Sequence, residues 1–169
     1  KVPFSLAQNP VSFGGWADIE RWGNNATGLL AAGPFAYNWK TGRVFRIQGD
    51  PGITGDAPDV FYIQQLPTDE GCISPNSPCR VGSKVCWQGR DKILSLGAND
   101  NEPVSLTDSI TPTMQAYSST KQGLAFSVYD TATKRFYMFY PSGSYGTSPN
   151  SEALVLSLKN GGSGWTQFT

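Results

Sequence analysis

Carboxylates are the residues of this chain best suited to catalysis, because its 169 residues contain no histidine. Histidine is the usual general base of hydrolases and a common metal ligand, so its absence excludes Ser-His-Asp and Cys-His catalysis within the chain and HExxH zinc sites. A glycosidase needs only two Asp or Glu side chains. Asp18 and Glu20 alternate on one potential strand face between aromatic residues, and Asp69-Glu70 precedes a cysteine-containing loop.

Most acidic residues stand instead in loops rich in Gly and Pro, where Asp usually caps a turn. The stretch 97–102 (GANDNE) has oxygen ligands at alternate positions but lacks the full EF-hand pattern, which favours a polar turn over a calcium site. We therefore expect a non-catalytic protein without metal or cofactor. The catalytic alternative is a glycosidase that uses two carboxylates, with Asp18 and Glu20 as the first choice.

Aromatic side chains are the other chemical resource, with nine Phe, seven Tyr and five Trp. Exposed aromatic rings can stack on sugars or other ligands. The candidates for ligand binding lie near Gly or Asn rather than inside apolar runs: Trp22, Trp39, Trp87 and Tyr145. The alternative is that such rings fill the interior of a small β-domain.

The three cysteines, Cys72, Cys79 and Cys86, are evenly spaced and too few for an ordinary four-thiolate zinc site. One disulfide and one free thiol is the better interpretation. A Cys72–Cys79 bridge would staple the turn ISPNSP and leave Cys86 free. Alternatively, a Gly82-Ser83 turn would place Cys79 opposite Cys86 in a hairpin. We favour the first pairing.

The charge balance argues against nucleic acid as a partner. Thirteen Lys and Arg balance thirteen Asp and Glu, and charged residues make up 15% of the chain, against roughly 25% in a typical soluble domain. No apolar run approaches the length of a membrane-spanning helix. Polar loops, a first residue Lys1 rather than Met, and the sequon Asn25-Ala26-Thr27 predict a secreted, extracellular chain with a glycosylation site at Asn25.

Short alternating segments separated by turn residues predict an all-β chain. The one helix candidate is 16–22, a single short turn at most. The expected strands are Leu29–Trp39, Val44–Gln48, Val60–Leu66, Lys84–Gln88, Ile93–Leu96, Pro103–Thr107, Met114–Ser118, Leu124–Tyr129, Phe136–Tyr140, Ala153–Leu158 and Trp165–Phe168.

The expected fold is one domain over 1–169, a single antiparallel β-barrel of about ten short strands, which avoids long exposed strand edges. Three segments share a hairpin pattern, in which an aromatic strand turns and restarts with a cation: 37–45, 87–94 and 129–137. Their spacing of roughly 42–50 residues is that of propeller blades, so a small four-bladed propeller is an alternative, as is a sandwich. Antiparallel hairpins also converge on this pattern without any repeat.

Two segments resemble the lipocalin signatures. Gly14-Gly15-Trp16 resembles the G-x-W that opens the first strand of that family, and Val128-Tyr129-Asp130-Thr131 resembles the second signature. The resemblance implies an eight-stranded barrel with the tryptophan at its closed end and a small hydrophobic ligand inside. The separation of the two motifs is longer than the family usually has.

The overall profile, which is neutral, cysteine-poor and aromatic-rich, is similar to small secreted β-barrel elicitor proteins of filamentous fungi. That resemblance implies an effector-like virulence protein that is perceived by, or binds, a host macromolecule or cell-surface component. We therefore expect a secreted recognition protein. The alternatives are a lipocalin-like barrel for a small hydrophobic ligand, and a carbohydrate-binding module or glycosidase acting on a glycan.

Overall fold

The computed structural model describes residues 2–6, 9–17, 25–49, 61–141, 150–159 and 164–168. Within these ranges the chain is all-β, as predicted, with short helices between two of the strands. The strands of this part form one two-stranded and three four-stranded antiparallel sheets. None of the helices among the described residues has the length and apolar character needed to cross a membrane.

Each sheet is a meander in which strands pair with their neighbours in sequence. The two-stranded sheet consists of β1 (Val2–Leu6) and β2 (Asn9–Ala17). The first four-stranded sheet consists of β3 (Ala26–Ala32), β4 (Phe35–Lys40), β5 (Arg43–Gly49) and β6 (Phe61–Gln65). The middle sheet consists of β7 (Cys79–Val81), β8 (Lys84–Gln88), β9 (Ile93–Gly97) and β10 (Val104–Ser105). The C-terminal sheet consists of β11 (Phe126–Asp130), β12 (Arg135–Pro141), β13 (Asn150–Ser157) and β14 (Trp165–Phe168).

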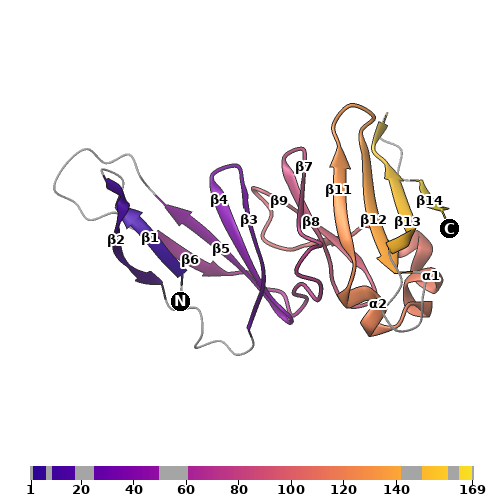
Figure 1. The fold of residues 1–169 in the computed structure, drawn as a ribbon, viewed down its shortest axis with the longest axis horizontal. Coiled ribbons are helices and arrows are strands. Elements are labelled where there is room, and N and C mark those ends of the chain that lie inside the picture. Colours follow the sequence, from indigo (N-terminus) through magenta and orange to yellow (C-terminus); the bar gives the residue numbers. More distant parts are fainter. Residues whose placement is uncertain are drawn as a thin grey trace.

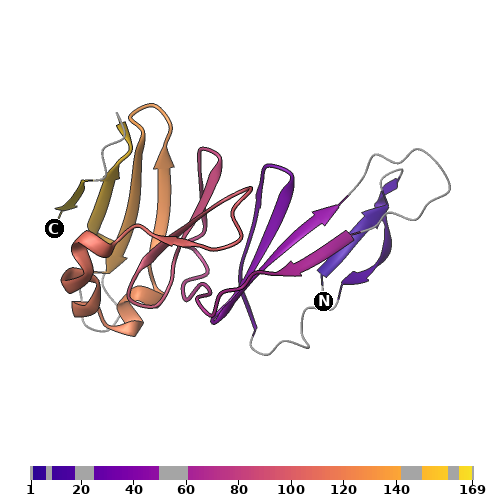
Figure 2. The same cartoon turned by 180° about the vertical axis from the view of Figure 1, so that it is seen from behind.

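The sheets follow one another along the long axis of the molecule, from the β1–β2 hairpin to the C-terminal sheet (Figures 1 and 2). Strand β7 contacts both β3 and β11, so the first strands of the three larger sheets lie side by side. The first hairpin turns of these sheets, at 33–34, 82–83 and 131–134, point the same way (Figure 1). We call this the hairpin end. The opposite, connection end holds the turns 41–42 and 89–92 and the connections 66–78 and 106–125.

The middle sheet is buried on both faces because successive side chains of a strand point to opposite sides. On β8, Val85 and Trp87 enter one hydrophobic core, shared with the first sheet, and Cys86 enters the other, shared with the C-terminal sheet. In the first core the rings of Trp39 and Trp87 meet across the two sheets, with centroids 5.5 Å apart. Packing of sheet face on sheet face therefore holds the three larger sheets together.

No closed barrel is found among the described residues, so the expected single barrel is not what this part of the chain shows. Each larger sheet is an open meander with two edge strands. Its apolar faces are covered by a neighbouring sheet, which removes the need for one sheet to curl and close on itself.

Two predicted strands differ most from the structure. The segment Leu29–Trp39 is divided into β3 and β4 by a turn at Gly33-Pro34, where Gly33 has a φ of 62° that favours glycine. The segment Met114–Ser118 is not a strand, because its first residues belong to helix α1 (Thr111–Ala116), which follows the 3₁₀ helix η2 (Asp108–Ile110). A proline in the first turn of α1 favours helix there.

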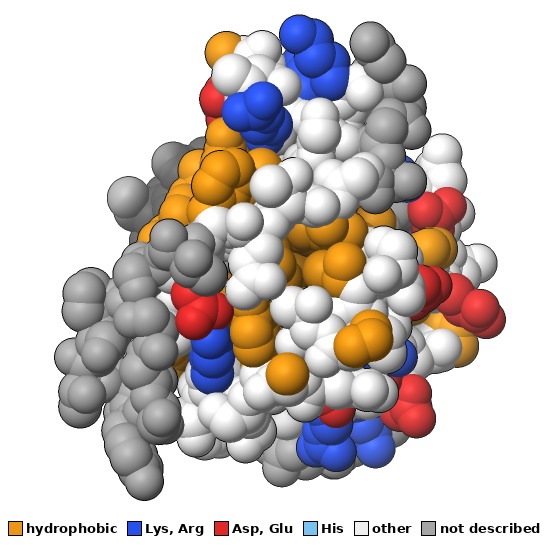
Figure 3. Space-filling model, turned by 90° about the vertical axis from the view of Figure 1, so that its right-hand side faces the viewer, with side chains coloured by type: hydrophobic (Ala, Val, Ile, Leu, Met, Phe, Trp, Pro, Cys, Tyr) orange, Lys and Arg blue, Asp and Glu red, His pale blue; other side chains and the backbone are white. Residues whose placement is uncertain are grey.

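The remaining connection contains helix α2 (Ser119–Gly123), capped by the side chain of Ser118, which accepts a hydrogen bond from the Lys121 amide. Together α1 and α2 cover the connection end of the core beneath the C-terminal sheet (Figure 1). From the side of β14 and α1, apolar side chains are visible in a hollow framed by backbone and uncharged side chains (Figure 3). The exposed large apolar residues after 106 in the described part are Leu124, Val128, Leu158 and Phe168.

Candidate functional site

A polar depression lies at the connection end, where the β8–β9 turn meets the segments on either side of the middle sheet. It has a volume of about 360 Å³, and we call it the polar pocket. Its lining comes from three segments far apart in the sequence: Glu70, Arg90, Asp91, Lys92, Ser105, Thr107, Asp108, Thr111 and Gln115. The fold thus brings together side chains that the sequence alone leaves unconnected.

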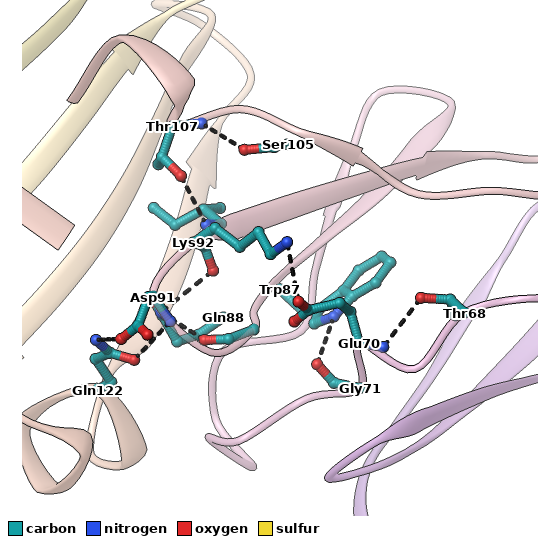
Figure 4. A network of polar contacts seen from close by, with 12 residues as sticks. Thr68, Glu70, Gly71, Trp87, Gln88, Asp91, Lys92, Ser105, Thr107 and Gln122 are labelled. Atoms are coloured by element: carbon teal, nitrogen blue, oxygen red, sulfur yellow. Dashed lines mark hydrogen bonds and ion pairs between the residues drawn. The ribbon is translucent and has the colours of Figure 1, made fainter. Parts of the chain in front are cut away.

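The turn that forms one wall is held in place by Gln122 of α2, which is buried. Asp91 adopts the left-handed conformation, with a φ of 56°, which Asp tolerates better than most residues. Its carboxylate Oδ1 accepts a hydrogen bond from Gln122 Nε2 at 2.9 Å, and its amide donates to Gln122 Oε1 at 3.0 Å (Figure 4). Gln122 Nε2 also lies 3.0 Å from the carbonyl of Tyr117. The turn is therefore fixed to the helical connection by side chain and backbone.

A second wall is closed by an ion pair between Lys92 and Glu70, with Nζ and Oε1 2.9 Å apart (Figure 4). Because these side chains are 37% and 29% exposed, the pair contributes at most about 1 kcal/mol to stability. The Glu70 amide donates to Thr68 Oγ1, and the next carbonyl, that of Gly71, accepts the indole N–H of Trp87 at 3.0 Å. Glu70 thus stands on a segment anchored directly to the core.

Buried hydrogen bonds support the base of the polar pocket. Gln88 Nε2 donates to the carbonyl of Gly89 at 2.8 Å, and Gln88 Oε1 accepts the hydroxyl of Tyr140 from the C-terminal sheet. On the other side, Thr107 Oγ1 accepts the Ile93 amide at 3.2 Å (Figure 4). Fully bonded buried polar groups of this kind make a rigid base.

The side chains at the rim of the polar pocket are exposed, unlike the buried groups at its base. The side chains of Arg90, Asp108 and Gln115 are exposed and make no hydrogen bond or ion pair within the described ranges. The pocket therefore combines carboxylates, cations and an amide, without an aromatic ring in its lining. This mixture suits a polar ligand with both donors and acceptors. It does not suit a polyanion, which would need clustered cations.

The tryptophans expected to contact ligand are placed differently. Trp39 and Trp87 each have an exposure of 0%, so neither indole face is open to a ligand, and both fill the core between the first and middle sheets. The bulk of an indole in a small β-domain favours this alternative. Trp22 and Tyr145 lie outside the described residues.

The expected Cys72–Cys79 disulfide is absent, and all three thiols are free. Cys72 packs in the core between the first and middle sheets, where its Sγ donates to the carbonyl of Ser74, whereas Cys79 packs against the other core. Burial raises the pKa of Cys72 to about 11 and that of Cys86 to about 12. Cys79 and Cys86 are direct partners in the β7–β8 hairpin, as the alternative pairing predicts, although no bond joins them.

The carboxylates suggested for catalysis and the turn suggested for calcium have separate outcomes. Asp18 and Glu20 lie outside the described residues, and Glu70 lines the polar pocket. The turn at 97–102 is a polar turn, because Asp100 Oδ2 accepts the Gly97 amide at 3.0 Å. The carbonyl oxygens of Ala98 and Asp100 in this turn accept hydrogen bonds from the Arg46 guanidinium. No group of three potential metal ligands occurs among the described residues.

Sequence reasoning missed most of the polar pocket. Arg90, Asp91 and Lys92 are visible as three consecutive charged residues in a turn, and this was the available signal. Gln115 could not be found, because 114–118 was expected to be a strand rather than part of a helix. Asp108 stood between two expected strands as one of several loop aspartates, with nothing in the sequence to single it out.

The two lipocalin-like segments lie in different sheets, with Trp16 on β2 and Asp130 at the end of β11. No protein-family model matches the chain, and no curated protein matches it either.

Proposed function

We propose that this chain is a non-catalytic recognition module that binds a polar segment of a partner macromolecule at the polar pocket. The proposal rests on the difference in hydrogen bonding between the base of the polar pocket and its rim. Buried hydrogen bonds of Gln88, Thr107 and Gln122 fix the walls, while Arg90 and Asp108 at the rim have no partner among the described residues. Walls that are already fixed need no ordering when a ligand binds, and unpaired rim groups are available to bond it.

The arrangement of the sheets supports this function. Successive four-stranded meanders with adjacent first strands are typical of propeller blades, and we interpret the three larger sheets in this way in preference to a single barrel. Scaffolds of this kind position loops from several sheets at one end, where binding residues concentrate. The polar pocket lies at the connection end, which is an end of this kind.

A non-catalytic role is supported by what the acidic side chains do. Glu152 pairs with Lys121 at 2.6 Å, and Glu70 pairs with Lys92. Asp130 caps the β11–β12 turn by accepting the amide of Ala132, and the hydrogen bond from the Thr133 hydroxyl is the main cause that lowers its pKa. These carboxylates have structural partners rather than the arrangement of an acid facing a base across a substrate.

The extracellular setting belongs to the proposal as well. Asn25 is exposed just before β3, as a glycosylated residue must be. The partner we propose is a host macromolecule or cell-surface component, read in the manner of an elicitor or effector. A glycan on that partner is the second candidate ligand, since carboxylates, amides and guanidinium groups all bind sugar hydroxyls.

The test is an array of cell-wall polysaccharides and purified surface glycoproteins, probed with labelled wild-type protein and two variants. Arg90→Ala/Asp108→Ala removes the unpaired charges at the rim. Lys134→Ala, in the β11–β12 turn at the hairpin end, is the matched control. We expect saturable binding to at least one component, weakened about tenfold or more by the rim variant, which corresponds to about 1.4 kcal/mol, and unchanged by the control.

Equal binding by wild type and the rim variant would show that the polar pocket is not the recognition site. Release of reducing ends from a polysaccharide on the array would contradict the non-catalytic assignment.

A further inference from the structure

A second cavity lies between the middle and C-terminal sheets, toward the hairpin end. Its volume is about 290 Å³, and it shares no lining residue with the polar pocket. We call it the apolar cavity. Its walls come from both sheets and from the residue after β10, with Val81, Leu106, Phe136 and Leu156 as the main apolar side chains.

The residues that line the apolar cavity suit the hydrocarbon part of a ligand. Cys86 belongs to the lining, and burial raises the pKa of its thiol to about 12, so it stays neutral at physiological pH. Ser95 adds one small polar side chain. Pockets with mainly apolar walls and few polar groups bind the apolar parts of ligands.

The mouth has a different chemistry. It is formed by Gly82 and Ser83 of the β7–β8 turn and by Lys84, which is exposed. Within the described part of the chain the Lys84 ammonium makes no ion pair, and no carboxylate lines the cavity. A positive charge at the rim of an apolar cavity complements a ligand with an apolar body and an anionic head.

We propose that the apolar cavity binds an aliphatic carboxylate, with its chain between the two sheets and its carboxylate on the ammonium of Lys84. A volume of about 290 Å³ is at the small end of ligand pockets, which span roughly 300–1,000 Å³, so a short to medium chain fits and a long fatty acid does not. This site is separate from the polar pocket and does not depend on the recognition function proposed above.

Calorimetric titration of the whole chain with octanoate and with 1-octanol tests the site. We expect saturable binding of both, with octanoate the tighter ligand. Lys84→Gln should weaken octanoate binding about two- to fivefold, the value of an exposed ion pair, and leave octanol binding unchanged. Lys134→Gln, a cation in the turn of another sheet, is the control and should change neither affinity.

A second variant tests the location independently. Ser95→Leu fills the cavity from β9 and should abolish binding of both ligands. Circular dichroism and thermal unfolding check that this variant folds. If Ser95→Leu does not fold, Leu158→Trp, at the exposed edge of the lining, takes its place. The proposal is overturned if the wild type shows no saturable octanoate binding, if Lys84→Gln binds octanoate as tightly as the wild type does, or if the folded filling variant still binds.

Discussion

At the scale of single residues, the three thiols differ in what surrounds them. Cys72 lies in one core and hydrogen-bonds to the Ser74 carbonyl and Ser77 hydroxyl, whereas Cys79 and Cys86 face each other in the β7–β8 hairpin. Directly opposed residues of antiparallel strands have Cα atoms about 4.5–5.5 Å apart, which is within the range that a disulfide spans. The sequence left two pairings open, and the register of β7 and β8 favours the second.

We predict that mild oxidation joins Cys79 to Cys86 and leaves Cys72 reduced. The half-buried Cys79 is the most accessible of the three thiols, and Cys86 is its direct partner on the neighbouring strand. Peptide mapping without reduction, after oxidation of the native protein, gives the pairing. Cys79→Ser should abolish the bridge. A Cys72–Cys79 peptide from native protein would contradict the geometry.

The same burial predicts how stability depends on pH. No histidine titrates, so the free energy of unfolding should be nearly constant from about pH 6 to 8. Above about pH 9 the unfolded chain releases thiol protons that the folded chain keeps, because burial raises the pKa of Cys72 to about 11 and of Cys86 to about 12. Stability should therefore fall as pH rises, by up to about 1.4 kcal/mol per pH unit for each thiol.

Urea unfolding under reducing conditions, at intervals from pH 6 to pH 10.5, measures this dependence. Cys72→Ser is the comparison, since its hydroxyl does not titrate and the alkaline slope should become shallower. A steep change between pH 6 and 8, or a constant stability up to pH 10.5, would show that the assigned groups are wrong.

At the scale of elements, the connection 66–78 carries Glu70 of the polar pocket and packs against the first sheet. The Cys72 amide donates to the Lys40 carbonyl at 2.9 Å, which brings this connection against the β4–β5 turn. Gly71 lies so close to that turn that a Cβ atom would overlap the Lys40 carbonyl oxygen and lie 2.6 Å from the Arg43 nitrogen. Only glycine permits this backbone approach.

Gly71→Ala should therefore destabilise the protein by about 3 kcal/mol or more, since both obstructing groups are backbone and cannot rotate away. Gly164→Ala is the matched control, because a Cβ there meets nothing within 4 Å, and its effect should stay within about 0.5 kcal/mol. Chemical denaturation of both variants measures the difference. If Gly71→Ala is as stable as the control, the close packing of this connection is wrong.

The elements also show which features a sequence can predict. Lys84–Gln88 and Trp165–Phe168 were predicted with the observed bounds, because alternation and flanking turn residues mark them clearly. The helix at 111–116 was missed because its apolar residues are too few for a helical stripe and its start is indicated only by a proline. Strand β7, with three residues, has no period to detect, although its hairpin was recognised as an alternative for the cysteines.

At the scale of the whole molecule, the repeated hairpin pattern acquires a structural meaning. The segments 37–45, 87–94 and 129–137 each form a hairpin, and each lies in a different four-stranded sheet. They occupy the second and third strands of the first two sheets but the first and second strands of the last, which explains their uneven spacing. The packing of one sheet on another could not be predicted from the sequence, because the same alternation of apolar and polar residues occurs in closed barrels and in stacked sheets.

The polar pocket depends on this whole-molecule arrangement, since its lining combines the β8–β9 turn of the middle sheet with residues from the segments before and after that sheet's central hairpin. The exposed rim should therefore contact a partner, and the hairpin end should not. Photo-crosslinking from benzoylphenylalanine placed at Gln115 measures this directly, with the same group at Thr131 in the β11–β12 turn as the control, using a component that binds on the array. We predict crosslinks from Gln115 and none from Thr131. Crosslinks from Thr131 alone, or equally from both positions, would contradict recognition at the polar pocket.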